Sequence, residues 1–170
     1  EHTPVQKVII VAGGGPERNE LWPATQLVAN FAYQSLKAQG FTPESIQYLS
    51  EEANNPDVDA APTIAEFESA ILNWTMAGEP ADDVLMYVVD HGGEGYFRLN
   101  ADTNLTAVHL DSWLDQLQAV LPGDLAVVYD ACESGSFIPI LTPPAGKERV
   151  VMTSADIGAA IFANGGRVSF

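Results

Sequence analysis

A histidine and a cysteine each follow a strongly apolar segment, and together they could perform covalent catalysis. His91 comes directly after the apolar run 84–89 and is followed by two glycines. Cys132 is the one cysteine of the 170-residue chain and closely follows the apolar run 125–129. If these runs are neighbouring strands of a parallel sheet, the imidazole and the thiol face each other across one strand spacing, about 5 Å.

A thiol becomes an effective nucleophile when a nearby base takes or shares its proton, and an imidazole can do so at neutral pH. The chain after Cys132 is expected to begin a helix, whose amino terminus favours a thiolate. Gly92 lets a carbonyl approach the backbone, so the amides of Gly92 and Cys132 are candidate oxyanion donors. Alone, each of His91 and Cys132 would more often be structural; their joint placement favours catalysis.

The elements that must position these residues follow from hydrophobic periodicity. Unbroken apolar or β-branched runs predict strands at 6–15, 45–50, 84–90, 125–130, 149–154 and 167–170, with a small hairpin strand at 96–99. Amphipathic spacing predicts helices over 24–39, 63–76 and 109–120, and Glu66 pairs with Thr63 as a capping box. Strands that alternate with helices and are apolar throughout predict an α/β fold, a three-layer α/β/α domain around a parallel sheet.

Composition excludes several classes of function. The chain carries 23 acidic and 7 basic residues, a net charge of −16, which repels nucleic acid and anionic lipid. Its longest apolar runs are too short to cross a bilayer, so we expect no membrane span in this segment. The chain begins with Glu1 and ends in an apparent strand. We therefore expect residues 1–170 to be a fragment or processed piece, a single domain of a longer chain with other domains. An extracellular, periplasmic or cell-surface location is the favoured one.

Other motifs that could indicate a cofactor or a different enzyme class are incomplete. Gly13–Gly15 follow the first strand, but Arg18 occupies the position of the third glycine in a dinucleotide fingerprint. A nucleophile elbow needs glycine two residues before the nucleophile, where this chain has Asp130. The acidic loop 51–62 lacks the spacing of a calcium-binding loop. We expect no cofactor and no metal.

Two motifs, YVVDHGG at 87–93 and YDACESGSF at 129–137, resemble the legumain-like branch of the caspase-like cysteine peptidases. The amino-terminal strand and helix are similar to those of legumains, and 153–170 is similar to the segment that helps form their specificity pocket. The resemblance therefore covers nearly the whole chain. It implies a caspase-like fold with a mainly parallel six-stranded sheet and hydrolysis of peptide bonds through a covalent thioester.

The same resemblance implies a role for each residue of the site. It casts Cys132 as the nucleophile, His91 as the acid and base, and the amides of Gly92 and Cys132 as the oxyanion hole. Asn19 falls where legumains carry an asparagine that orients the histidine. A loop asparagine without a catalytic role is the alternative for Asn19.

Substrate choice is where the chain departs from legumains. Legumains build their first pocket with an Arg-His pair after that asparagine, and here Leu21 and Trp22 stand in its place. Asp130 remains, where metacaspases and paracaspases place an acidic residue to hold a basic side chain. A buried aspartate without an arginine neighbour would attract Lys or Arg at the cleavage site, P1, with Asn as the alternative. Further residues expected to line this pocket are Ser154, Asp156 and Asn164.

We therefore expect a cysteine endopeptidase that acts on peptide or protein substrates. One alternative is a caspase-like fold used for binding or assembly, or held latent until a partner or a further segment arrives. Another is a transpeptidase or ligase, because an amine can attack a thioester in place of water. Lys147 and Arg149, in the proline- and glycine-marked connection 137–149, are the expected site of any self-cleavage.

Overall fold

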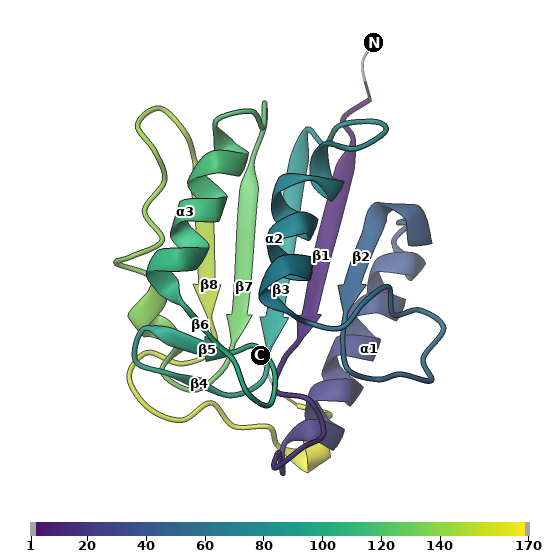
Figure 1. The fold of residues 1–170 in the computed structure, drawn as a ribbon, viewed down its shortest axis with the longest axis vertical. Coiled ribbons are helices and arrows are strands. Elements are labelled where there is room, and N and C mark those ends of the chain that lie inside the picture. Colours follow the sequence, from purple (N-terminus) through teal and green to yellow (C-terminus); the bar gives the residue numbers. More distant parts are fainter. Residues whose placement is uncertain (1–2, 169–170) are drawn as a thin grey trace.

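The computed structural model describes residues 3–168 and is built around a parallel sheet (Figure 1). Its five strands are β1 (Gln6–Ala12), β2 (Ile46–Leu49), β3 (Asp83–Val89), β7 (Leu125–Asp130) and β8 (Arg149–Thr153). The strand order is β2-β1-β3-β7-β8, and every neighbouring pair is parallel. All five strands therefore present their carboxyl ends along one edge, where ligands of such sheets collect.

Helices cover both faces of the sheet, which confirms the predicted three-layer arrangement (Figure 1). Helix α1 (Trp22–Ala38) packs on one face, and α2 (Ile64–Leu72) and α3 (Ala107–Gln118) pack on the other. Successive residues of β1 point to opposite faces, so Val8 and Ile10 join the core beneath α1, while Ile9 and Val11 join the core beneath α2 and α3.

Threonine caps begin two of the helices. The Thr63 hydroxyl accepts from the backbone N–H of Glu66 at 3.1 Å, which is one half of the predicted capping box. The other half is absent, because the Thr63 N–H donates to the Ala61 carbonyl at 2.9 Å and not to the Glu66 side chain. Helix α2 then ends at Leu72, before a short 3₁₀ helix, η2 (Trp74–Met76). Thr106 caps α3 through the N–H of His109 at 3.2 Å, so α3 begins at Ala107 rather than at His109. The other 3₁₀ helices are η1 (Pro43–Ser45), η3 (Ser134–Phe137) and η4 (Asn164–Gly166).

A second, antiparallel sheet lies across the carboxyl edge of the main one. It consists of β4 (Gly92–Gly93), β5 (Tyr96–Arg98) and β6 (Asn104–Thr106). Sequence patterning predicts β5 but not its partners, because two glycines and a three-residue segment carry too little periodicity. The buried side chains of Phe97 and Leu105 anchor this small sheet in the main core.

The predicted last strand differs from the structure in its described part. Arg167 follows η4, and Val168 pairs with Ala163 in an isolated antiparallel bridge instead of joining the main sheet. The rest of that predicted strand, residues 169–170, lies outside the described residues. Within residues 3–168, the central sheet therefore has five strands where six were expected. Across the same residues, none of the helices combines the length and the apolar character needed to cross a membrane.

Candidate active site

The strands that carry His91 and Cys132 are direct neighbours, as predicted. Strand β3 pairs with β7 over six residues, and the last pair joins Val89 to Asp130. The ladder continues for one more step, because the backbone N–H of Asp90 donates to the Asp130 carbonyl at 3.3 Å. His91 and Cys132 therefore leave adjacent strands at the same edge of the sheet.

Gly92 brings these two strand ends into contact. A side chain at this position would collide with the Cys132 carbonyl oxygen, the Tyr129 hydroxyl and the Ala131 methyl group. Glycine is required here because the backbone of β4 lies directly against the segment that carries the thiol. His91 and Cys132 are both half-buried, so part of each residue is exposed at the surface.

The side chains of His91 and Cys132 make no hydrogen bond with each other in the described part of the chain. Catalytic hydrogen bonds are commonly long in a free enzyme and shorten when substrate binds. The arrangement brings a thiol and an imidazole to one edge without joining them.

Asn19 contacts Asp90, the residue before His91. Its side-chain N–H donates to Asp90 Oδ1 at 2.9 Å, and its own carbonyl oxygen accepts from the Leu21 N–H at 3.0 Å. The Thr25 hydroxyl, in the first turns of α1, donates to the same carboxylate oxygen at 2.8 Å. These bonds tie the end of β3 to the start of α1 and hold the backbone that leads into His91.

The Asp90 carboxylate is fully buried, and its Oδ2 has no hydrogen-bond partner among the described residues. Burying a charged group is costly unless it is hydrogen-bonded, so two donors on Oδ1 are needed to keep it here. Gly14 has a φ of 72° and packs so closely that a side chain would collide with this carboxylate. Sequence reasoning missed Asp90 and Thr25; a carboxylate that ends an apolar strand was the available signal for Asp90.

The segment after Cys132 corrects one expectation. Glu133 has a left-handed φ of 56° and is followed only by the four-residue 3₁₀ helix η3. Such a short turn has no macrodipole to favour a thiolate. The loop after β8 holds this turn instead: the Glu133 N–H donates to the Gly158 carbonyl at 2.8 Å, and Ser134 exchanges hydrogen bonds with the Ala155 backbone.

Tyr129 belongs to β7, three residues before Cys132. Its hydroxyl donates to the Tyr96 carbonyl at 3.3 Å, which links β7 to the small sheet. Burial, reinforced by the nearby Cys132, raises the pKa of Tyr129 well above its ordinary value. The phenol therefore stays neutral and keeps its donor at physiological pH.

The four residues predicted to line the specificity pocket differ in their exposure. Asp130 is buried, 1% exposed, and accepts from the Tyr87 hydroxyl at 3.3 Å. Ser154 follows the pair Tyr129–Thr153 in register, which places it beside Asp130, and its Oγ is buried without a partner among the described residues. The other two are exposed: Asp156 lines a cavity with Glu94 and Glu133, and Asn164 belongs to η4, which packs on α1.

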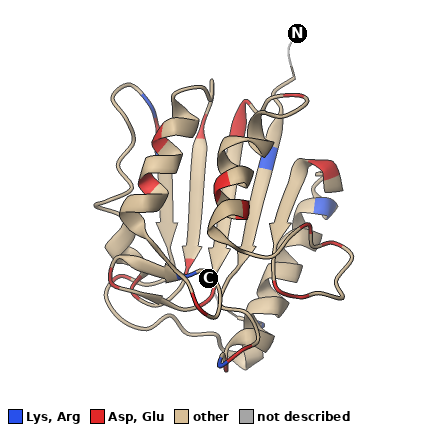
Figure 2. Ribbon diagram, in the orientation of Figure 1, with Lys and Arg blue, Asp and Glu red and all other residues tan. Residues whose placement is uncertain are grey.

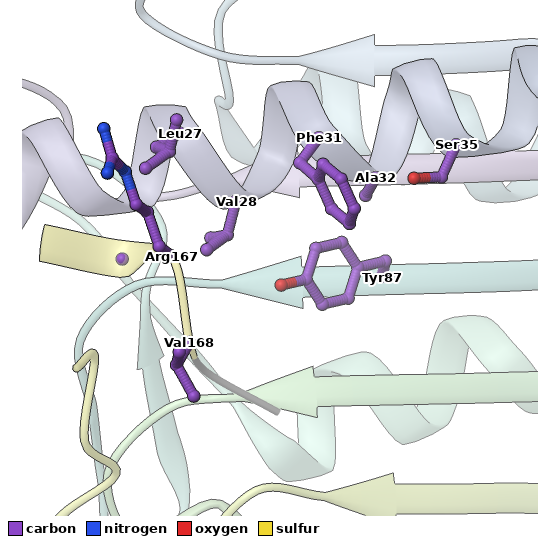
Figure 3. Close-up of a pocket in the computed structure, with 9 residues that line it drawn as sticks. Leu27, Val28, Phe31, Ala32, Ser35, Tyr87, Arg167 and Val168 are labelled. Atoms are coloured by element: carbon purple, nitrogen blue, oxygen red, sulfur yellow. The ribbon is translucent and has the colours of Figure 1, made fainter. Parts of the chain in front are cut away.

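A largely apolar cavity of about 590 Å³ lies on the α1 face, and Tyr87, which donates to Asp130, is among the residues that line it (Figure 3). The rings of Tyr87 and Phe31 face each other across it, and Arg167 and Val168 stand at its end (Figure 3). Burial, with a contribution from the Asp130 carboxylate, raises the pKa of the Tyr87 hydroxyl well above its ordinary value. The Tyr87 hydroxyl therefore stays protonated at neutral pH, lines this cavity with its ring and donates to Asp130.

Comparison with known proteins places the chain in a family. The profile of the Peptidase C13 family, the legumain family, matches residues 68–164, more than half of the chain. The chain belongs to the Peptidase C13 family. The matched range of this C13 chain includes His91, Cys132 and Asp130, whereas Asn19 precedes it. No curated protein sequence matches the chain significantly.

Comparison with solved structures bears on the fold of this C13 chain. Caspase-1 from Spodoptera frugiperda matches with a TM-score of 0.66 and 17% identity, over 99% of this chain and 66% of that one. A secreted C11 cysteine protease from Bacteroides thetaiotaomicron matches with a TM-score of 0.45 and 15% identity, over 82% of this chain and 46% of that one. The caspase-1 match shows that this C13 chain has a caspase-like fold. The chain spans less than two thirds of either of these proteins.

Proposed function

We propose that the chain is a cysteine endopeptidase in which Cys132 is the nucleophile and His91 transfers the protons. The observation that carries this proposal is the contact of the two strand ends, where Gly92 lies against Cys132 at the edge common to β3 and β7. The match to the Peptidase C13 family across both residues supports it.

The reaction proceeds by acyl transfer in two steps. Cys132 gives its proton to His91 and forms a sulfur–carbon bond with the peptide carbonyl. The carbon–nitrogen bond then breaks as His91 protonates the leaving amine, which leaves a thioester. Water, deprotonated by His91, hydrolyses the thioester and frees the thiol. The amides of Gly92 and Cys132 stabilise the oxyanion in both steps.

The P1 residue of the substrate is proposed to bind beside Asp130. Asp130 and Ser154 adjoin at the edge of the sheet, and neither side chain contacts a cation among the described residues. A buried carboxylate with this free capacity would pair with Lys or Arg, and the Ser154 hydroxyl adds an acceptor or donor for Asn. Lys and Arg are the first choice and Asn is the second.

A latent state is the second candidate. The imidazole of His91 and the thiol of Cys132 are not hydrogen-bonded to each other. The loop after β8 is hydrogen-bonded to Glu133 and Ser134, which follow the proposed nucleophile in the chain. A partner that moves this loop would then complete the site, and without one the fold would act in binding or assembly. Ligation is a third outcome of the same chemistry, because an amine can replace water at the thioester.

Cleavage of a fluorogenic peptide library with every residue at P1 tests these proposals together. Wild-type protein should cleave after Lys, Arg or Asn, and Cys132→Ala and His91→Ala should not. Equal rates for wild type and Cys132→Ala would contradict the assignment of the nucleophile. Activity that appears only with an added partner indicates latency, and amine-extended products in mass spectra indicate ligation.

A further inference from the structure

A cavity next to His91 has a charge opposite to that of the protein as a whole. It has a volume of about 520 Å³ and is lined by His91 and Gly92, by Tyr96 and Arg98 of β5, and by Arg18 and Asp102. We call it the arginine pocket. The chain has 23 acidic and only 7 basic residues, and the acidic ones are spread over helices, loops and sheet edges (Figure 2). Two arginines beside the proposed acid–base residue are therefore an unusual local concentration of positive charge in this acidic chain.

The positive charge of the Arg98 guanidinium is not paired with a carboxylate among the described residues, and most of its N–H donors are unused. It is half-buried and donates to the backbone carbonyls of Glu17 at 3.0 Å and Arg18 at 3.4 Å. These two contacts fix its orientation but carry no negative charge. Arg98 has no carboxylate partner among residues 3–168. Three of the five N–H donors of a guanidinium remain for a ligand.

Arg18 has only a weak internal partner. Its side chain lies 3.2 Å from an Asp102 oxygen, and the two side chains are 69% and 82% exposed. Exposed ion pairs contribute little, because water solvates both charges. A carboxylate that contacted Arg98 at the same time could therefore displace Asp102 from Arg18 at small cost.

The chemistry of the proposed reaction indicates which half of the substrate would lie at the arginine pocket. His91 must donate its proton to the leaving amine, so it faces the leaving-group half of the substrate. The arginine pocket adjoins His91 and Gly92, whereas Asp130 and Ser154 lie on the α1 face of the sheet. The leaving half of the peptide would therefore lie along the arginine pocket.

We propose that the arginine pocket binds a carboxylate of the leaving-group half of the substrate, an inference that rests on the proposed function. The carboxylate is either an Asp or Glu side chain within three residues of the scissile bond or the free carboxyl terminus of a short leaving peptide. Arginine holds a carboxylate through two parallel hydrogen bonds. This contact opposes the general repulsion between an acidic peptide and an acidic protein, which salt screens over about 8 Å at physiological ionic strength.

Binding to an inactive variant tests the pocket separately from catalysis. Cys132→Ala protein is titrated, at constant salt, into fluorescein-labelled heptapeptides that carry Arg or Asn at position four. Each peptide has Glu or Gln at position five, six or seven, and ends in either a free carboxylate or an amide. Fluorescence anisotropy should show about threefold to tenfold tighter binding of the Glu peptide at one position, or of the free-acid peptide. The two arms distinguish a side-chain carboxylate from a terminal one.

Matched variants assign the preference to the arginines. Arg98→Gln and Arg18→Gln should remove it, Arg98→Lys should retain part of it, and Asp102→Asn should increase it by freeing Arg18. Lys37→Gln is the control, because it makes the same change in net charge at a lysine near the end of α1, where the ammonium lies over Tyr33. Circular dichroism checks that each variant is folded.

Two results would overturn the arginine pocket as a carboxylate site. One is equal binding of all Glu and Gln pairs and of all acid and amide pairs. The other is a loss of preference in Lys37→Gln as large as that in Arg98→Gln, which would assign the effect to overall charge. A carboxylate preference in a wild-type protein that cleaves nothing would contradict the proposed function and leave the pocket supported. Cleavage without any preference for a carboxylate would support the proposed function and contradict the arginine pocket as a carboxylate site.

Discussion

The side-chain amide of Asn19 donates a 2.9 Å hydrogen bond to the carboxylate of Asp90, and not to the imidazole of His91. The family resemblance implies that this asparagine orients the histidine. In the structure it can act on His91 only through the residue before it in the chain. Asn19 is thus a candidate positioning residue that holds the end of β3 against the start of α1.

Asn19→Ala should lower both stability and turnover. The change leaves the buried Asp90 carboxylate with Thr25 as its one side-chain donor among residues 3–168, at a cost of about 1–3 kcal/mol in the free energy of unfolding. If Asn19 positions His91, kcat should fall with KM nearly unchanged. Asn30→Ala is the control, because Asn30 also donates to a carboxylate, Glu52, but away from the site. An equal fall in kcat for Asn30→Ala would contradict a positioning role.

Gly92→Ala should abolish activity. The new methyl group would collide with the Cys132 carbonyl oxygen and the Tyr129 hydroxyl, so β4 would have to move away from the thiol. Gly123→Ala creates a similar collision with Asp83 at the opposite edge of the sheet. Both variants should unfold at lower denaturant concentration, and only Gly92→Ala should lose turnover per folded molecule. Full turnover in Gly92→Ala would show that the contact is not needed.

Arg149→Leu should destabilise the fold. The fully buried Arg149 side chain contacts Asp111 and Asp115 of α3 at 2.7 Å each and donates to Gln118 at 2.9 Å. Its removal leaves two partly exposed carboxylates unpaired, at a cost of about 2–4 kcal/mol in denaturant unfolding. Arg18→Leu, which breaks an exposed ion pair, should change stability by about 0.5 kcal/mol or less. Similar losses in both variants would contradict this difference.

The same contacts bear on self-cleavage. Cleavage after Arg149 would require its side chain to leave its ion pairs with Asp111 and Asp115 of α3. Cleavage after Lys147 would require its ammonium to give up a hydrogen bond to the Leu121 carbonyl, at 2.7 Å. We expect Lys147, on the loop outside β8, to be the preferred site of any cut in 137–149. Intact mass after prolonged incubation measures this directly, and a cut after Arg149 would contradict it.

Stability should fall above pH 10, in part through Tyr87. Burial and the Asp130 carboxylate raise the pKa of Tyr87 in the folded state, while the unfolded chain ionises near the ordinary value of 10.0. The unfolded state therefore loses its proton first. Stability is unaffected by Tyr87 below pH 10 and falls as pH rises above it, by about 1.4 kcal/mol per pH unit for one such group. Urea unfolding from pH 8 to 11 should show a shallower fall in Tyr87→Phe, and an unchanged slope would contradict this prediction.

The sequence predicts the main sheet and its two reactive strand ends because these depend on local apolar runs. Two long unbroken runs, one followed by His91 and the other by Cys132, are enough to predict that these residues leave neighbouring strands at the same edge of the sheet. The partner of Asn19 could not be predicted in this way, since Asp90 is 71 positions away and reaches it only through the fold. Its burial between Gly14 and Thr25 has no signature in hydrophobic periodicity.

The remaining differences also have local causes. The small polar residues after Cys132 are typical of a helix start, but Glu133 turns left-handed and only a 3₁₀ turn follows. The loop after β8 has no regular period, so nothing in its sequence indicates that Asp156 and Asn164 are exposed while Asp130 is buried. The small strand β4 consists of two glycines and carries no strand propensity of its own.

Covalent capture tests the central claim most directly. Wild type, His91→Ala and Cys132→Ala are treated with acyloxymethyl ketone peptides ending in Arg or Asn, and the adduct is located by intact mass and peptide mapping. We predict one adduct, on Cys132 of the wild type, which forms at least about a hundredfold more slowly in His91→Ala and not at all in Cys132→Ala. Equal rates in wild type and His91→Ala, or an adduct on another residue, would contradict the pairing of this thiol with this imidazole.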